Sequence, residues 1–201
     1  MTSRAELRGR PAATSHAAIE QAAFRLFAER GFAATTLEAI AAELGVSRRT
    51  VTRYYRSKLD IPWGRFDQTL AAFRDLLDAT PAELPLWERV HRGVVAFNDF
   101  PADADPSHRD RMRLILHTPA LQAHSVLRYD EWRAVIAAYV AEQTGARPTD
   151  LLPRVVAQVS QALAVSAYEA WLETPETAGP GTLPALLDEA MSGLRDHLEG
   201  T

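Results

Sequence analysis

The stretch that decides the fold is Leu37–Tyr54, LEAIAAELGVSRRTVTRY. It has the pattern of two short helices that meet at Gly45, and the second helix carries Arg48, Arg49 and Arg53. Glycine tolerates the positive φ that a tight turn between helices requires. The stretch therefore predicts a helix-turn-helix, in which the second helix enters the major groove of DNA.

The steric requirements of that motif are met position by position. Two helices that cross closely need a small residue at the crossing, and Ala41 fills that position. Apolar residues fall where they would lock the pair of helices to the rest of the domain: Ile40, Leu44, Val46 and Val51. A short helical hairpin in an ordinary core can share this pattern. It has no reason, however, to place three arginines, two threonines and two tyrosines outward, so we favour DNA binding.

Nine residues are predicted to contact DNA: Thr36, Ser47, Arg48, Arg49, Thr50, Thr52, Arg53, Tyr54 and Lys58. The first turns of a reading helix approach base edges, where an arginine that binds guanine O6 and N7 contributes about 1–3 kcal/mol of discrimination. Ser47 is also a fitting N-cap for this helix. Thr36, Tyr54 and Lys58 are expected at phosphates, which fix register without reading sequence.

Two interpretations stay open for three further residues. Tyr55 either contacts DNA or packs in the core. Arg8 and Arg10 either follow the minor groove or belong to a solvated arm.

The charge distribution agrees with one nucleic-acid-binding end. Residues 1–58 hold ten Lys and Arg against five Asp and Glu, while the whole chain of 201 residues has a net charge of −4. A basic front on an acidic body suits contact with a polyanion through that end. The chain has no cysteine and no apolar run of the roughly 18 residues that a membrane span needs. We expect a cytoplasmic protein with no membrane partner.

The rest of the chain has helical periodicity and no alternating strand pattern, so the predicted fold class is all-α. We expect an N-terminal helix-turn-helix domain with a flexible arm over 1–57, and a helical bundle over 58–201. The expected helices cover 15–30, 36–45, 47–55, 58–79, 86–100, 107–117, 120–127, 129–145, 151–172 and 183–198. Pro62 is unusual in the fourth helix and predicts either a kink there or a later helix start.

Three blocks of the first domain carry a family resemblance: AAFRLFAERGF (22–32), TTLEAIA (35–41) and GVSRRTVTRYYRSK (45–58). Residues 15–60 resemble the N-terminal domain of the TetR family of bacterial transcription regulators. The chain departs from that family at Thr52, where members usually carry an aromatic residue that touches phosphate. Two further stretches, IPWGRFD (61–67) and RMRLIL with PALQAHS (111–116 and 119–125), resemble the mycofactocin-system subgroup.

The resemblance implies that the second domain binds an effector and dimerises. Its aromatic residues suit an apolar pocket with a few polar groups, although aromatic residues at helical spacing also build ordinary cores. The predicted effector-binding residues are Trp63, Phe66, Phe97, Met112, Leu116, His124, Trp132 and Tyr168. Polar candidates beside them are Asn98, His117, Gln122 and Gln158.

Two reading heads about 34–36 Å apart read a palindromic operator, which predicts a homodimer. The last two helices are the expected pairing surface, through Leu151, Leu163, Val165, Ala167, Leu183, Leu187, Ala190 and Leu194.

The sequence thus predicts a ligand-responsive repressor that binds a palindromic double-stranded operator and is released by a small hydrophobic effector of acyl-CoA type. The alternative is a constitutive regulator whose bundle only dimerises. An enzyme is not expected, because no nucleophile elbow, phosphate-binding loop or His-Glu-x-x-His motif occurs. No cofactor is expected. No metal is expected either, because Pro119 separates His117 from His124 and no third ligand lies nearby.

Overall fold

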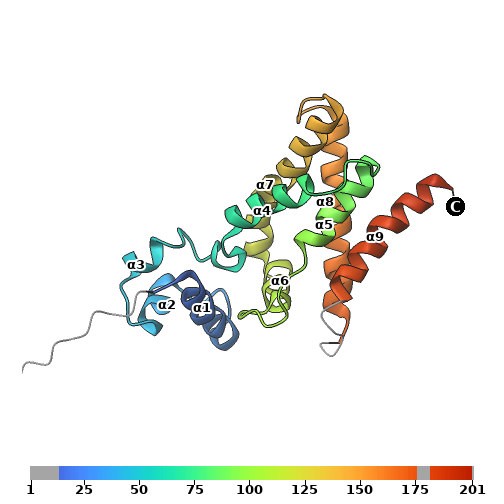
Figure 1. Ribbon diagram of the computed structural model, residues 1–201. Helices are drawn as coiled ribbons and strands as arrows, with labels where there is room; N and C mark the ends of the chain where they lie inside the picture. Colours follow the sequence, from blue (N-terminus) through green and yellow to red (C-terminus); the bar gives the residue numbers. More distant parts are fainter. Residues whose placement is uncertain (1–13, 176–181, 201) are drawn as a thin grey trace, which may run out of the picture. The chain divides into compact units, whose positions relative to one another are not determined.

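The computed structural model describes residues 14–175 and 182–200, and every described element is a helix (Figure 1). The described chain divides into two compact units, the first ending at Gly64 and the second starting at Arg65. The predicted boundary after residue 57 thus falls earlier than the observed one. Arg8 and Arg10 lie outside the described residues.

The first unit holds three α-helices and a 3₁₀ turn: α1 (His16–Arg30), α2 (Leu37–Glu43), α3 (Arg48–Thr52) and η1 (Ile61–Trp63). A hydroxyl side chain starts each α-helix: Ser15, Thr36 and Ser47 each accept a hydrogen bond from the backbone N–H three residues later, at 3.1 Å. Such caps each contribute about 1 kcal/mol by satisfying an N–H that the helix leaves unpaired.

The predicted crossing of α2 and α3 is confirmed. Ala41 and Val51 are buried, and Gly45 has a φ of 65° in the turn between the helices. Leu44 and Val46 are half-buried. The core beneath the two helices is made of residues from α1, α2, α3 and η1, with relative exposures of 6% or less: Ile19, Ala22, Ala23, Leu26, Phe27, Ile40, Ala41, Val51 and Ile61.

The predicted helix over 58–79 is wrong at its start, because α4 covers only Phe66–Asp78. Pro62 lies in η1, where its missing N–H costs little, and Gly64 follows with a φ of 59° and a ψ of −138°. A non-glycine residue rarely adopts that backbone conformation. Of the two interpretations of Pro62, the later helix start is therefore the one observed.

The second unit holds α4, α5 (Leu86–Phe97), α6 (His108–His117), α7 (Pro119–Thr144), α8 (Leu151–Glu173) and α9 (Thr182–Glu199). The predicted break near residue 128 is wrong, because α7 is continuous over 26 residues. No glycine or proline interrupts it, and Gly145 ends it in the left-handed conformation with a φ of 69°.

The long helices α7 and α8 pack side by side, and α9 packs along α8 and contacts α5 (Figure 1). Three residues of the predicted pairing stripe, Ala167, Leu183 and Leu187, lie in this core at 3% exposure or less. Their assignment to a dimer surface was wrong, since the chain buries them itself.

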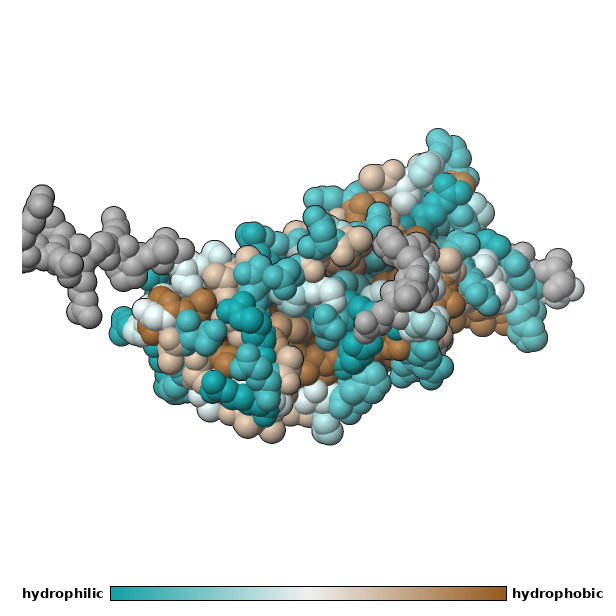
Figure 2. Space-filling view, turned by 90° about the horizontal axis from the view of Figure 1, so that it is seen from below, coloured by the Kyte–Doolittle hydropathy of each residue, from teal (hydrophilic) through white to brown (hydrophobic). Residues whose placement is uncertain are grey.

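The face shown in Figure 2 is largely hydrophilic with apolar residues interspersed. Among the described residues of the second unit, the exposed large apolar ones are Val126, Leu127, Leu151, Leu152, Val155 and Leu198. Among the described helices, none combines the length and the apolarity that a bilayer crossing requires.

Candidate nucleic-acid interface

The second helix of the motif, α3, has one buried and one open face. Val51 is fully buried and fixes the helix to the unit, while Arg48, Arg49 and Arg53 are exposed. The guanidinium groups of Arg49 and Arg53 have no acidic partner in the described part of the chain. Two unpaired, planar cations on a short capped helix are suited to bidentate contacts with phosphates or guanine.

Arg48 differs from its two neighbours, because its Nε lies 2.9 Å from Glu38 Oε1 of α2. Both side chains are well exposed. This partner was not predicted from the sequence. Both residues are visible in the sequence, each in the first turn of its helix, but their pairing depends on how the two helices cross.

The hydroxyl groups of α3 are used inside the motif. Ser47 Oγ lies 3.0 Å from Thr50 Oγ1, and Thr52 Oγ1 donates to the Arg49 carbonyl at 3.1 Å. Both threonines are half-buried. Their methyl groups remain the parts suited to an apolar contact with thymine.

The residues assigned to phosphate contacts have different surroundings. Thr36 is exposed at the start of α2. Tyr54 is half-buried, and its hydroxyl donates to the Thr14 carbonyl at 2.5 Å. Lys58 Nζ donates to three carbonyls, those of Phe32, Ala33 and Thr35, at 2.7–3.0 Å. Because these bonds use all three of its donors, Lys58 braces the segment between α1 and α2.

The open question about Tyr55 is answered by its burial. The side chain is 4% exposed, and its hydroxyl donates to a carboxylate oxygen of Glu20 on α1. Tyr55 is therefore a core residue that links the end of the motif to α1. The acid on the buried face of α1 was the signal for this partner.

Two of the predicted effector residues, Phe97 and Trp132, lie together in an aromatic cluster of the second unit. Phe97 and Trp132 contact Phe73 of α4, with ring centroids 4.6 and 5.3 Å apart, and lie 6.2 Å from each other. Phe100 extends this cluster from Phe97 toward His108. Phe66 and Met112 are buried elsewhere in the unit, Leu116 and His124 are half-buried, and Trp63 belongs to the first unit.

A polar chain of three side chains continues the aromatic cluster. Asn98 Nδ2 donates to the Val94 carbonyl at 2.7 Å, which orients its Oδ1 to accept from the Tyr168 hydroxyl. That hydroxyl then accepts from Nε2 of His108, 2.8 Å away. Asn98 and Tyr168 were predicted from the sequence, whereas His108 was not, because no periodic pattern marks it.

Burial sets the protonation of this chain. Desolvation, with a smaller contribution from the Arg111 charge, lowers the pKa of His108 to about 3. Burial likewise raises the pKa of the Tyr168 hydroxyl far above its ordinary value. The imidazole and the phenol are therefore both neutral near pH 7, as required for the donor order described above.

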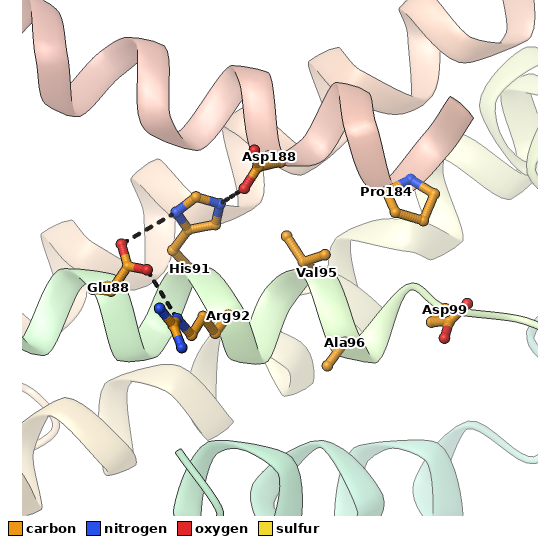
Figure 3. A pocket seen from close by; sticks show the side chains of 8 residues that line it. All are labelled: Glu88, His91, Arg92, Val95, Ala96, Asp99, Pro184 and Asp188. Carbon is orange, nitrogen blue, oxygen red and sulfur yellow. Dashed lines mark hydrogen bonds and ion pairs between the residues drawn. The ribbon is translucent and has the colours of Figure 1, made fainter. Parts of the chain in front are cut away.

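A groove of about 450 Å³ lies between α5 and α9 (Figure 3). Its lining residues are Glu88, His91, Arg92, Val95, Ala96, Asp99, Pro184 and Asp188, and none of them belongs to the predicted effector set. His91 is 4% exposed, with Nε2 3.0 Å from Asp188 and Nδ1 3.8 Å from Glu88. It thus connects the two helices.

Comparison with known proteins agrees with this geometry. Residues 19–61 match the model of the N-terminal domain of bacterial regulatory proteins of the TetR family, and residues 84–199 match the MftR C-terminal domain. The protein named as mycofactocin biosynthesis transcriptional regulator MftR of Mycobacterium tuberculosis is 40% identical over 92% of this chain and 94% of its own length.

Two more distant relatives show how widely the architecture is shared. The transcriptional regulator TcmR of Streptomyces glaucescens is 28% identical over 88% of this chain and 80% of its own length. The crystal structure of Thermus thermophilus FadR, a TetR family repressor in complex with lauroyl-CoA, aligns with a TM-score of 0.54 at 22% identity and covers 93% of this chain and 95% of that one. The chain belongs to the TetR family of transcriptional regulators, and within it to the group that carries the MftR C-terminal domain.

Proposed function

We propose that this regulator is a ligand-responsive repressor that binds a palindromic operator as a homodimer through the outer face of α3. The observation that carries the proposal is a pair of exposed arginines without an acidic partner in the described residues, Arg49 on α3 and Arg53 at its C-cap. Val51 anchors the other face of the helix. Thr36 and Arg48 extend that surface across the start of α2 and α3. A cytoplasmic location, where the operator is accessible, is part of the same proposal.

Exposed apolar residues support the homodimer. Leu151, Leu152 and Val155 on the first turns of α8 are 78%, 54% and 45% exposed. Solvent exposure of three large apolar side chains within five residues is unfavourable for an isolated subunit, and burial recovers about 25 cal/mol per Å² of apolar surface. A second copy would cover them and supply the second reading head.

The effector proposal depends on the aromatic cluster around Phe97 and Trp132 together with the polar chain that ends at Asn98. A hydrophobic ligand would replace contacts between these rings, and the neutral His108 and Tyr168 would orient a polar group on it. Because the Thermus thermophilus FadR structure contains lauroyl-CoA, a medium-chain acyl-CoA is the first ligand to test.

Selection of bound sequences from a random DNA pool, followed by titration of the selected site, tests the core of the proposal. We expect a palindrome with half-sites about one helical turn apart, and a steep loss of affinity with salt because phosphates are neutralised. Failure to enrich any sequence would contradict the proposal.

The constitutive regulator is the second candidate, and the direct stacking of Phe73 on Trp132 favours it, since these rings already satisfy each other. Titrating lauroyl-CoA and free CoA into the operator complex separates the two candidates. Release by the acyl form, with a raised melting temperature of the free protein, supports the repressor. No release by a series of acyl-CoA chain lengths supports the constitutive regulator.

A further inference from the structure

The ion pair between Glu38 and Arg48 is the one acidic contact made by the arginines of α3 in the described residues. Arg48 Nε lies 2.9 Å from Glu38 Oε1, and the side chains are 62% and 61% exposed. Glu38 follows the Thr36 cap in the first turn of α2, so this carboxylate lies on the surface that we propose contacts DNA. We infer that Glu38 is a specificity-determining residue, which positions Arg48 and weakens binding to DNA of arbitrary sequence.

The positioning follows from the geometry of the guanidinium group. Arginine has five N–H donors in a rigid planar fork. Because Glu38 binds at Nε, the terminal nitrogens of Arg48 remain available to a guanine edge or a phosphate. A carboxylate at Nε restricts the rotation of the long side chain, so Arg48 offers that edge in fewer orientations than Arg49 or Arg53.

The second effect is electrostatic. Non-specific DNA binding depends almost entirely on the attraction between cations and phosphates. Glu38 opposes that attraction in every register and neutralises Arg48 in part, while the contact of a positioned Arg48 with a matching base is gained only at the operator. The carboxylate therefore lowers affinity for arbitrary DNA more than affinity for the operator. This increases the ratio of operator affinity to affinity for arbitrary DNA.

The inference depends on the proposed function, and its test uses the Glu38→Gln variant of the full chain. The measurements are the dissociation constants for the selected operator and for a scrambled duplex of equal length, at one salt concentration. We expect affinity for the scrambled duplex to rise about two- to fivefold, the range of a single exposed charge pair, with a smaller rise or a fall for the operator. An equal change for both duplexes, or no change, would overturn the inference.

Glu43→Gln is the matched control. Glu43 lies on the same helix, is exposed, and pairs at 3.6 Å with Arg25 of α1 rather than with α3. The substitution removes the same charge without touching Arg48, so we expect an unchanged ratio of the affinity for the operator to the affinity for the scrambled duplex. A fall in the ratio equal to that of Glu38→Gln would reduce the effect to net charge and would also overturn the inference.

An Arg48→Gln background provides the double-mutant cycle. If Glu38 acts by positioning Arg48 as well as by charge, Glu38→Gln changes the ratio much less once Arg48 is absent; an effect of the same size in both backgrounds would refute the positioning. Thermal unfolding of each variant verifies that α2 is intact. If the wild-type chain selects no sequence, the proposed function fails; if it selects an operator and Glu38→Gln leaves the ratio unchanged, only this inference fails.

Discussion

The two units of this regulator are organised by contacts of different range along the chain. In the first unit, the helix-turn-helix is shaped by residues three to five positions apart, such as Ser47 with the N–H of Thr50 and Val46 with the carbonyl of Ala41. In the second unit, the Tyr168 hydroxyl and Asn98 are 70 residues apart, and Thr80 and Tyr139 are 59 apart. The helix-turn-helix therefore presents a functional surface on local turns and caps, which longer contacts such as Tyr55 with Glu20 fix to the rest of its unit. The second unit depends on packing between distant helices.

The largest effect should come from the surface of the first unit, without any loss of stability. We expect the double substitution of Arg49 and Arg53 by Ala to weaken operator binding at least about thirtyfold, because each arginine contributes about 1–3 kcal/mol at a base or phosphate. Gel-shift or anisotropy titration measures it. The melting temperature should stay within a degree or two, since both side chains are exposed.

Arg30→Ala is the control for charge, because Arg30 is exposed at the end of α1 rather than on α3. A loss of affinity as large as that of the double variant would place the DNA contact on the wrong surface. A large fall in the melting temperature of the double variant would contradict the division between surface and frame.

In the second unit, by contrast, we expect a substitution to change the stability of the fold. Gly93 of α5 lies against the fully buried Leu77 of α4, so a Cβ at Gly93 would overlap Leu77 Cδ2 and lie 3.1 Å from its Cγ. We expect Gly93→Ala to lower the free energy of unfolding by about 1–3 kcal/mol, the usual cost of overpacking. Chemical denaturation measures this change.

Gly193→Ala is the matched control, since no atom lies within 4 Å of the added Cβ on the exposed side of α9. There we expect a gain of about 0.5–1 kcal/mol from helix propensity. If the two substitutions had the same sign, the close approach of α4 and α5 would not matter to stability.

The same contrast in contact range explains which features of the structure could be predicted from the sequence. The α2–α3 turn, the Ser47 cap and the burial of Ala41 and Val51 follow from residue type at fixed spacing, so sequence was sufficient for them. Glu38 and Arg48 were both visible in the sequence, but their pairing needs the crossing angle of two helices. For the same reason, Leu183 and Leu187 were wrongly predicted to lie on the dimer surface. An apolar stripe does not indicate whether a helix of the same chain or a second subunit covers it.

The continuity of α7 shows another limit of sequence prediction. Arg128 interrupts the apolar periodicity between two predicted helices, yet nothing around it breaks a helix, and the neighbouring helices α6 and α8 give α7 a continuous partner surface. Helix ends were located well where a cap or a glycine marks them, as at Ser15 and Gly145. They were located poorly near Pro62, where two interpretations were equally allowed.

A pH dependence of stability should arise from the second unit. The pKa of His108 is lowered to about 3, below its ordinary value near 6.5, so the unfolded chain binds the proton more readily than the folded one. Stability from this group is complete above about pH 6.5 and is lost as the pH falls toward 3, with a decrease of up to about 2 kcal/mol at pH 5. The free energy of unfolding at pH 7 and pH 5 measures it.

His108→Phe is the comparison for that slope, because it retains a ring beside Phe100 and removes the titrating group. The variant should lose most of the difference in unfolding free energy between pH 7 and pH 5, even if it is less stable at both. An unchanged slope would assign the acid sensitivity to a group other than His108.

The smallest expected effect concerns the local frame of the first unit. Ser47→Ala removes the cap of α3 and the contact with Thr50, and it should lower stability by about 1 kcal/mol. Ser47→Asp, which restores an acceptor at the same position, should recover stability but weaken operator binding because its charge opposes phosphate. If local contacts determine the structure of the helix-turn-helix, stability and operator affinity will change independently in these two variants. Thermal unfolding and DNA titration measure the two quantities. Equal losses of affinity in both would mean instead that the serine hydroxyl itself contacts DNA.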